Sequence, residues 1–361
     1  MFDGRDRRQA ALRAAMAAQG LDGLLVSGSA NIRYLTGFSG SAGQLLVTTN
    51  RTVLVTDFRY EVQGPDEVGS SAELRIERSD LWEGLRAALT TSAVERLGID
   101  KTRVTLADRD ELSQAKGVTL IPVHGLVEPL RAAKDPDEVA TIKAAADLAT
   151  DALAASIGFI RAGRTELQVA ALLESNLRQR GSEWHPFQSI VASGPRSALP
   201  HARSTERVIE PGDLLVVDFG AKVRGYCSDI TRTFVVGARA DERQRTTYEV
   251  VRQAQARARS GLKAGLTGRE GDSLARDVIN RAGMGPAFGH SLGHGLGLDV
   301  HEAPRLSQTS EAPLATGAVV TVEPGVYFQG WGGVRIEDDV VLLSDRAECL
   351  SDGMTDLVEL V

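Results

Sequence analysis

Two pairs of acidic residues lie beside strand-like apolar runs in separate parts of this sequence. Asp218 and Asp229 border a charged, Gly-rich turn between two such runs, and Glu323 and Glu337 do the same about one hundred residues later. Both segments have the strand–turn–strand pattern of a β-hairpin. We therefore expect each pair to face across a hairpin, where directly opposed residues have Cβ atoms roughly 4.5–5.5 Å apart.

The positions of the acids give the expected centres of the two hairpins. The midpoint of the first pair falls in Val223–Arg224, and the midpoint of the second is Gly330. Two carboxylates held this close repel each other unless one is protonated or a cation lies between them. Because the chain repeats the arrangement, the sequence favours a bound cation.

Histidines supply further candidates between the two hairpins. The segment Gly289–Glu302 contains His290, His294 and His301, three of the chain's six histidines, among glycines that let a backbone approach a ligand closely. With His294, the four acids make five candidate metal ligands. Their combined charge is about −4 when the carboxylates are ionised and the imidazole is neutral. Two divalent cations neutralise that charge.

The composition of this ligand set indicates the metal and the chemistry. Oxygen-rich sites prefer harder metals, so we expect Mn²⁺, with Co²⁺ or Zn²⁺ as alternatives. Two metal ions roughly 3.5–4 Å apart lower the pKa of a shared water and stabilise a tetrahedral intermediate, as in dinuclear hydrolases. Any one of these acids alone is more typical of a turn cap or a solvated residue. Glu323, however, lies among Val319, Val320 and Val322, where an unpaired charge is costly.

The composition is that of a globular protein with one or two domains. Of the 361 residues, 42% are hydrophobic and 25% are charged, as is typical of such proteins. The net charge of −7 argues against nucleic-acid or membrane partners, which require a basic surface. Cys227 and Cys349, the two cysteines, are too few for a disulfide framework. No signal peptide or long apolar run is evident, so we expect a cytoplasmic protein.

Alternating strands and helices predict an α/β domain over residues 1–132, to which we assign no chemistry. Helices are expected over 6–19 and 81–89, and strands over 23–26, 44–49, 52–57, 73–77, 96–99 and 104–107. The Gly-rich segment 37–43 lacks the GK[ST] of a phosphate loop. Asp135, Pro136 and Glu138 have the pattern of a capped helix start, which places the domain boundary at Ala133–Asp137.

Residues 133–361 are predicted to form an α+β domain that carries the site. Helices are expected from Pro136, after Thr165, over 242–262 and around 272–281, in addition to the two hairpins. An irregular strand and loop before the first hairpin carries His185 and His201. No tandem repeat or low-complexity tract is present.

Five sequence blocks of this second domain closely resemble the metal-binding blocks of the pita-bread metallopeptidases. They are VVDFG, SDITRTF, GHGLGLDVHE, VEPG and GVRIEDD, and they contain the five candidate ligands in order. The segment LDGLLVSGSANIRYLTGFSGSAG resembles the creatinase-like N-terminal domain of the proline-specific branch, aminopeptidase P and prolidase (Xaa-Pro dipeptidase). The resemblance covers nearly the whole chain. It implies an α/β N-terminal domain followed by an α+β pita-bread catalytic domain.

The resemblance also implies a role for each candidate ligand. Asp218 and Asp229 would bind one metal ion, and His294 and Glu323 would bind the other. Asp229 and Glu337 would bridge the two ions. Glu323 would in addition help to move the proton of the bridging water.

Further residues receive roles in substrate binding from the same resemblance. His290 would face the substrate, and His301 would hydrogen-bond the scissile carbonyl or the oxyanion that develops on it. His201, in the segment LPHARS, matches a substrate-pocket histidine of the family. Arg335 would orient the carboxylates beside the metals.

The implied activity is hydrolysis of the Xaa-Pro bond at the N-terminus of short peptides by a homodimeric aminopeptidase P. An Xaa-Pro bond has no N–H for extended backbone pairing, which explains the need for a dedicated enzyme. Xaa-Pro dipeptidase is the alternative, because Arg305 is placed where some prolidases clamp the free carboxylate of a dipeptide. The N-terminal domain favours the aminopeptidase.

Three other classes are weaker interpretations. A metal-free peptide-binding module and creatinase share the fold without the metals, and the five intact ligand positions disfavour both. The third class is a kinase with Asp218-Phe219-Gly220 as its DFG motif. This chain lacks the HRD motif of a kinase, and it has no glycine-rich loop followed by VAIK.

Overall fold

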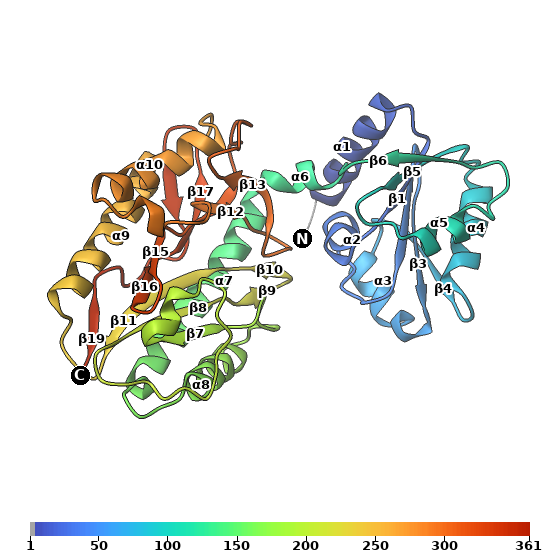
Figure 1. Cartoon of the computed structure of the whole chain (residues 1–361). Helices are drawn as coiled ribbons and strands as arrows, with labels where there is room; N and C mark the ends of the chain where they lie inside the picture. Colours follow the sequence, from blue (N-terminus) through green and yellow to red (C-terminus); the bar gives the residue numbers. More distant parts are fainter. Residues whose placement is uncertain (1–3) are drawn as a thin grey trace. The chain divides into compact units, whose positions relative to one another are not determined.

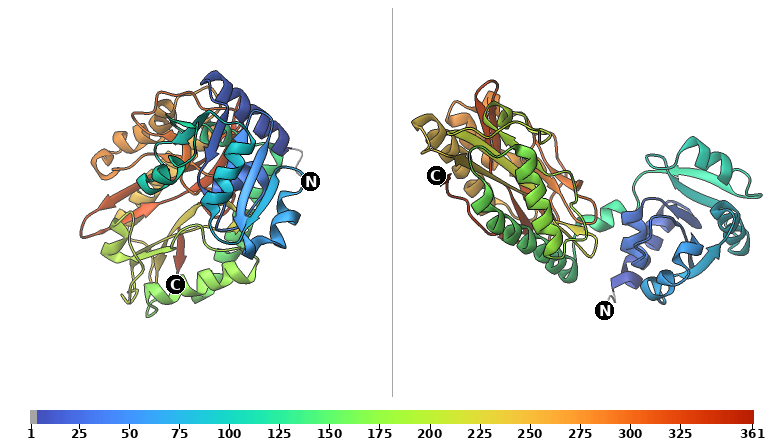
Figure 2. Two further views of the ribbon diagram at one scale, coloured as in Figure 1. Left: turned by 90° about the vertical axis from the view of Figure 1, so that its right-hand side faces the viewer. Right: turned by 90° about the horizontal axis from the view of Figure 1, so that it is seen from below.

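The computed structural model describes residues 4–361 and divides into two compact units, one ending at Arg131 and one beginning at Ala132. The first three residues of the predicted domain 1–132 lie outside the described part of the chain. Figures 1 and 2 show the ribbon from three directions. Among residues 4–361, none of the helices combines the length and the apolar character that a membrane crossing requires.

A six-stranded mixed sheet forms the centre of the first unit, in the order β4-β3-β2-β1-β5-β6. The strands are β1 (Gly23–Val26), β2 (Gln44–Thr48), β3 (Thr52–Asp57), β4 (Glu73–Glu77), β5 (Arg96–Asp100) and β6 (Thr119–Val123). The helices are α1 (Gly4–Ala18), α2 (Ser29–Thr36), α3 (Gln63–Val68), α4 (Leu81–Thr91), α5 (Leu106–Leu112) and α6 (Glu128–Ala132). In Figure 1 the sheet lies between α1 and α2 on one side and α4 and α5 on the other.

Most elements predicted for the first unit are confirmed, but the strand predicted over 104–107 is wrong. That segment is the start of α5, whose N-cap is Thr105. The Thr105 hydroxyl accepts the Asp108 N–H at 3.1 Å, and the Asp108 carboxylate accepts the Thr105 N–H at 2.9 Å. A short apolar run does not distinguish a strand from a helix start, and here the capping box decides. Helices α2, α3 and α6 and strand β6 were not predicted.

Two helix pairs and two larger sheets make up the second unit. The helices are α7 (Pro136–Ser156), α8 (Glu166–Gln179), α9 (Glu242–Gly261) and α10 (Gly268–Arg281). The first sheet, in the order β19-β11-β8-β7, contains β7 (Ile190–Ser193), β8 (Asp213–Phe219), β11 (Ile230–Val236) and β19 (Val358–Leu360). The second, in the order β13-β12-β14-β17-β18, contains β12 (Gly293–Gly295), β13 (Glu302–Leu306), β14 (Val319–Val322), β17 (Asp338–Leu342) and β18 (Ala347–Cys349). Two short pairs extend the hairpins: β9 (Lys222–Val223) with β10 (Tyr226–Cys227), and β15 (Gly325–Phe328) with β16 (Gly332–Arg335).

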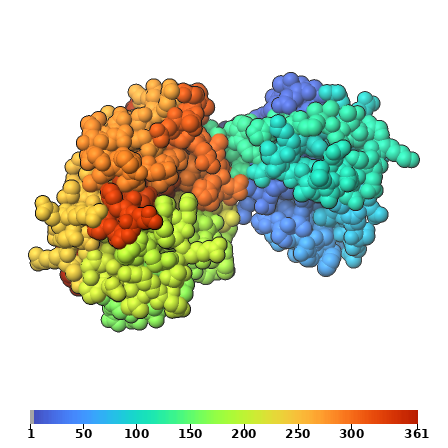
Figure 3. All heavy atoms as spheres, in the orientation of Figure 1, coloured from blue at the N-terminus to red at the C-terminus, as the bar shows by residue number. Residues whose placement is uncertain are grey.

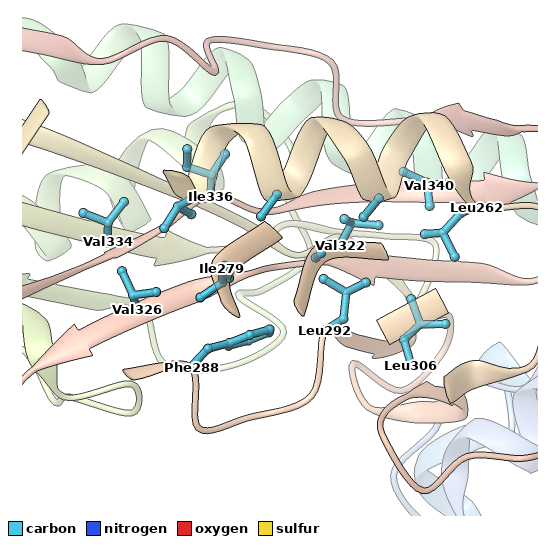
Figure 4. Close-up of a cluster of buried hydrophobic side chains, with 14 of the residues drawn as sticks. Leu262, Ile279, Phe288, Leu292, Leu306, Val322, Val326, Val334, Ile336 and Val340 are labelled. Carbon is cyan, nitrogen blue, oxygen red and sulfur yellow. The ribbon is translucent and has the colours of Figure 1, made fainter. Parts of the chain in front are cut away.

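Each helix pair packs on one of the two larger sheets through a buried apolar core. Leu262, the C-cap of α9, and Ile279 of α10 are buried against side chains of the second sheet, such as Val322 and Val340 (Figure 4). Helices α7 and α8 form a separate core with the first sheet. On the face in Figure 3, green-to-yellow atoms of the earlier part of this unit meet orange-to-red atoms of the later part.

The second acidic hairpin has the predicted register. The strand pairs β14–β17 and β15–β16 are both centred on Gly330. Glu323 and Glu337 therefore lie opposite each other, in the short break between the two ladders. This prediction is confirmed.

The first acidic hairpin does not have the predicted register. Asp218 pairs with Thr231, not with Asp229. The reason is the turn, in which both Arg224 (φ 47°) and Gly225 (φ 81°) adopt positive φ. Two successive residues of this kind form a two-residue turn that matches the twist of a hairpin. They place the hairpin centre between residues 224 and 225, so the two aspartates are staggered by two positions.

Candidate metal centre and substrate cavity

One cavity of about 690 Å³ in the second unit is lined by all ten residues singled out in the sequence. They are His201, Asp218, Asp229, His290, His294, His301, Arg305, Glu323, Arg335 and Glu337. Seven further lining residues were not predicted, namely Phe187, Gln188, Ile190, Pro200, Ala202, Arg203 and Ser291. The residues come from both larger sheets and from the loops beside them, so the cavity exists only when the two halves of the unit are packed together.

The two aspartates of the first hairpin are buried, and each has one carboxylate oxygen without a hydrogen-bond partner, Asp218 Oδ1 and Asp229 Oδ1. Asp218 Oδ2 accepts a hydrogen bond from Arg335 Nη2 at 2.5 Å. The backbone N–H of Asp229 donates to the carboxylate of Asp339 at 3.0 Å. A buried carboxylate oxygen without a partner is costly, and a bound cation removes that cost.

The two glutamates of the second hairpin are held by threonine hydroxyls. Thr321 Oγ1 donates to Glu323 Oε1 at 3.2 Å, and Thr231 Oγ1 donates to Glu337 Oε2 at 2.5 Å. Thr231 belongs to β11 of the first sheet, so it joins Glu337 to the other hairpin. Burial raises the pKa of Glu323 to about 8.

His294 lies between the two acidic hairpins on β12. Its Nε2 atom is 3.7 Å from Asp229 Oδ2 and 3.4 Å from Glu323 Oε1. Its Nδ1 atom is 3.1 Å from the Gly295 carbonyl oxygen. Because a carbonyl only accepts, Nδ1 must carry the proton, which leaves the lone pair of Nε2 available for a metal. Burial lowers the pKa of His294 to about 4, so the ring is neutral at pH 7.

The donor set fits divalent cations. Asp229, His294 and Glu337 each offer one ligand atom, and these three atoms lie within 4.8 Å of one another. Burial, followed by the neighbouring carboxylates, raises the pKa of Asp229 and of Glu337 well above the usual range. Arg335 contacts only one of the four acids, Asp218, directly. One guanidinium does not neutralise three buried carboxylates and the half-buried Glu323, so the cluster needs further positive charge to ionise.

A chain of hydrogen bonds links Arg335 to His290 through Tyr327. Arg335 Nη1 donates to Tyr327 Oη at 2.9 Å, and Tyr327 Oη is 3.0 Å from His290 Nε2. Since the arginine can only donate, the tyrosine hydrogen is free to point at His290 Nε2. His290 Nδ1 is 2.8 Å from the Ser291 carbonyl oxygen. His290 therefore lines the cavity with both ring nitrogens already engaged within the protein.

Tyr327 was not singled out in the sequence, because an aromatic residue in a strand normally indicates packing. Burial raises the pKa of Tyr327 to about 12 and lowers that of His290 to about 4. Both side chains are therefore neutral at pH 7. The pair supports the position of Arg335, and through it that of Asp218.

The outer wall of the cavity carries two arginines and two histidines. His201, Arg203, His301 and Arg305 are exposed there. Arg305 pairs with His294 across β12 and β13. Burial lowers the pKa of His301, and the nearby Arg305 lowers it further. Within residues 4–361, neither Arg203 nor Arg305 forms an ion pair, so both guanidinium groups are available to an anionic group of a ligand.

Cys227 and His185, which receive no role in the proposed site, have ordinary surroundings. Cys227 is buried, and burial raises its pKa to about 12. The His185 ring lies against the Trp184 ring, with centroids 4.6 Å apart. Neither residue lines the cavity.

Comparisons with known proteins agree with this geometry. Residues 140–343 match the family model "Metallopeptidase family M24", and residues 8–133 match "Creatinase/Prolidase N-terminal domain". The chain is 40% identical over 348 residues to the uncharacterized peptidase YqhT of Bacillus subtilis, covering 96% of this chain and 98% of that protein.

Two solved structures are similar over nearly their whole length. An Xaa-Pro dipeptidase from Bacillus anthracis has a TM-score of 0.96 at 40% identity, covering 99% of this chain and 100% of that one. An X-Pro aminopeptidase from Thermotoga maritima has a TM-score of 0.90 at 38% identity, covering 96% of this chain and 100% of that one. The predicted fold, an α/β domain followed by a pita-bread domain, is confirmed. The chain is an enzyme that belongs to metallopeptidase family M24.

Proposed function

We propose that this enzyme hydrolyses the bond between an N-terminal residue and proline in short peptides. The observation that carries the proposal is that the ten residues named from the sequence line one cavity. Its inner part is an acidic cluster with two unpartnered carboxylate oxygens, and its outer wall carries arginines. The relatives that share the fold over their whole length include proteins named Xaa-Pro dipeptidase and X-Pro aminopeptidase.

The proposed metal ligands are Asp218, Asp229, His294, Glu323 and Glu337, and the proposed metals are two divalent cations. Mn²⁺ is the first expectation, because four of the five ligands are carboxylates. When bound, the two cations would supply Lewis acidity that acidifies a water molecule and stabilises negative charge on the scissile carbonyl.

The remaining steps depend on side chains of the chain itself. The Glu323 carboxylate is placed to accept a proton inside the cavity and to pass it to the leaving proline nitrogen. His301, on the outer wall, is proposed to donate a hydrogen bond to the substrate carbonyl oxygen. Arg335 holds Asp218 Oδ2 at 2.5 Å, which keeps that carboxylate in one orientation. His201 is proposed to contact the bound peptide.

The two unpaired arginines favour dipeptides as substrates. In an Xaa-Pro dipeptide the free carboxylate lies on the proline, one residue beyond the scissile bond. Arg305 and Arg203 can each bind a carboxylate there by a charge-assisted hydrogen bond. Aminopeptidase P activity on longer peptides is the second candidate, supported by the similarity to the Thermotoga maritima enzyme.

Steady-state kinetics on three peptide classes test the proposal. The purified enzyme, stripped with chelator and reloaded with Mn²⁺, is given an Xaa-Pro dipeptide, an Xaa-Pro-Yaa tripeptide and an Xaa-Ala dipeptide. We expect turnover of a proline peptide only after reloading, with the dipeptide preferred. Equal cleavage of Xaa-Ala, or turnover that survives the chelator, would count against the proposal.

We also propose that residues 1–132 form a non-catalytic domain and that residues 133–361 carry the catalysis. The support is that every residue lining the cavity lies at or beyond residue 187. A cytoplasmic homodimer remains our expectation from the sequence. Light scattering coupled to size exclusion tests the dimer, and fractionation of cells tests the location.

A further inference from the structure

The loop that carries His201 is fastened at both ends to the carboxylate of Glu166. Glu166 is the first residue of α8 and is 0% exposed. Its Oε1 accepts the N–H and the hydroxyl of Ser193 at 2.8 and 2.9 Å. Its Oε2 accepts the N–H and the hydroxyl of Thr205 at 3.0 and 2.8 Å. Ser193 ends β7 just before the loop and Thr205 follows the loop, so one side chain joins its two ends.

Arg196 connects the same carboxylate to the cavity wall. Its Nε atom lies 3.2 and 3.1 Å from the two oxygens of Glu166. Its Nη2 donates to the carbonyl oxygen of Arg203, which is two residues beyond His201 and lines the cavity. Through Arg196, Glu166 therefore also holds the backbone at Arg203, close to His201 in the loop.

The opposite side of the loop contacts the strand that carries Arg335. Arg335 Nη1 donates to the Pro200 carbonyl oxygen at 3.3 Å, and the Gly333 N–H donates to Ser197 Oγ at 2.9 Å. The exposed His201 ring forms no hydrogen bond within the described chain. Its position consequently depends on the loop backbone between these two sets of contacts.

The chemistry at Glu166 requires a carboxylate. Five donor groups converge on its two oxygens, and a carboxylate offers about four lone-pair sites and no hydrogen. A glutamine of the same shape would turn an NH₂ group toward donors of Ser193 or Thr205. That substitution should loosen the loop without removing any side-chain volume.

We propose that Glu166 is a positioning residue that fixes His201 in the substrate cavity. The inference rests on the proposed function, because it assigns His201 a contact with the peptide. Glu166 acts through the loop and not through the metals, since no candidate metal ligand is hydrogen-bonded to it.

The test compares Glu166→Gln with Glu138→Gln in the full-length, Mn²⁺-loaded enzyme. Glu138 is also buried at a helix start, and its carboxylate accepts a hydrogen bond from the Tyr226 hydroxyl at 2.7 Å. Glu138 does not line the cavity. We expect Glu166→Gln to lower kcat/KM for an Xaa-Pro dipeptide about 10- to 100-fold, because misplacing a substrate-contacting group by about 1 Å can cost up to about 100-fold. Mn²⁺ affinity should stay unchanged, and Glu138→Gln should keep wild-type kcat/KM. Hydrogen exchange should accelerate in peptides covering 194–205 and not elsewhere.

A double variant separates positioning from a general loss of structure. In the His201→Ala background, Glu166→Gln should change kcat/KM by less than about threefold, because coupled residues are not additive. The inference would be overturned if the losses of kcat/KM in the two single variants multiply fully in the double variant. It would also be overturned if Glu166→Gln keeps wild-type kcat/KM, or if hydrogen exchange in 194–205 does not change. If the wild-type enzyme cleaves no Xaa-Pro peptide, the proposed function fails instead, and the exchange measurement alone then decides whether Glu166 fixes the loop.

Discussion

Thr231 and Glu337 join the two acidic hairpins through both backbone and side chain. The Glu337 N–H donates to the Thr231 carbonyl oxygen at 3.1 Å, and the Thr231 hydroxyl donates to Glu337 Oε2 at 2.5 Å. The same hydroxyl accepts a hydrogen bond from Arg335 Nε at 3.0 Å. One buried threonine thus orients both the carboxylate proposed to bridge the metals and the arginine that holds Asp218.

Replacing Thr231 with valine should weaken metal binding. The Thr231→Val substitution keeps the side-chain shape but removes the hydroxyl that orients Glu337. Loss of such a supporting contact commonly lowers metal affinity about 10- to 100-fold, and calorimetric titration with Mn²⁺ measures it. Thr233→Val is the matched control, because the Thr233 hydroxyl bonds only the backbone of Arg335, at 2.8 and 3.1 Å. Equal losses of affinity in both variants would contradict the role of Thr231.

Removing the Tyr327 hydroxyl should reduce stability and turnover together. Tyr327→Phe leaves a nitrogen of Arg335 and Nε2 of His290 without their shared partner, and an unsatisfied buried polar group costs about 1–3 kcal/mol. Arg335 is then less firmly held against Asp218, so kcat should fall while KM changes little. Denaturant unfolding and steady-state kinetics measure the two effects. A destabilised variant with wild-type kcat would show that Asp218, Thr231 and Pro200 hold Arg335 in place without Tyr327.

Substitution of Arg305 should separate dipeptides from longer peptides. A hydrogen bond to a charged group contributes about 1.5–3 kcal/mol, so Arg305→Ala should lower kcat/KM for an Xaa-Pro dipeptide by about 10- to 100-fold. Turnover of an Xaa-Pro-Yaa tripeptide, which has no carboxylate on proline, should be spared. Arg203→Ala tests the second guanidinium in the same assay, and Arg257→Ala, an exposed arginine of α9, is the control. Parallel loss on both substrates would argue against carboxylate recognition by Arg305.

Metal removal should make the stability of the enzyme depend strongly on pH. In the metal-free fold, burial raises the pKa of Glu323 to about 8, and burial followed by neighbouring carboxylates raises that of Asp229 and Glu337 well above the usual range. Unfolded carboxyls have pKa values of about 4, so the folded state binds more protons. The stabilisation that these carboxyl groups give to the folded, metal-free enzyme is therefore complete below about pH 4, and it is lost as the pH rises toward 8.

Thermal unfolding with and without Mn²⁺ at pH 6 and pH 8 measures this dependence. The metal-free enzyme should have the lower Tm at pH 8, and Mn²⁺ should raise Tm more at pH 8 than at pH 6, because metal ligands must be deprotonated. If the metal-free enzyme has a Tm at pH 8 that equals or exceeds its Tm at pH 6, the raised pKa values of the buried carboxyl groups are contradicted.

Much of the local structure could be read from short stretches of sequence. The capping box of Asp135 and Glu138 predicts the start of α7, and the structure contains it. The spacing of Glu323 and Glu337 about Gly330 predicts their opposition, because the apolar strands on either side fix the register. The same reasoning failed for Asp218 and Asp229. Positive φ angles at Arg224 and Gly225 set the centre of that hairpin. An arginine in the sequence does not indicate a positive φ, so the turn could not be located from the sequence.

The sequence by itself determined which side chains could do chemistry, because four acids and three histidines in Gly-rich hairpins and loops are costly unless they bind something. Only the tertiary structure decided how they meet. Thr231, Tyr327 and Glu166 each contact residues elsewhere in the chain, and their own neighbourhoods do not show which partners they bind. Hydrogen bonds between distant segments depend on how the two sheets pack, and that packing is a property of the whole unit.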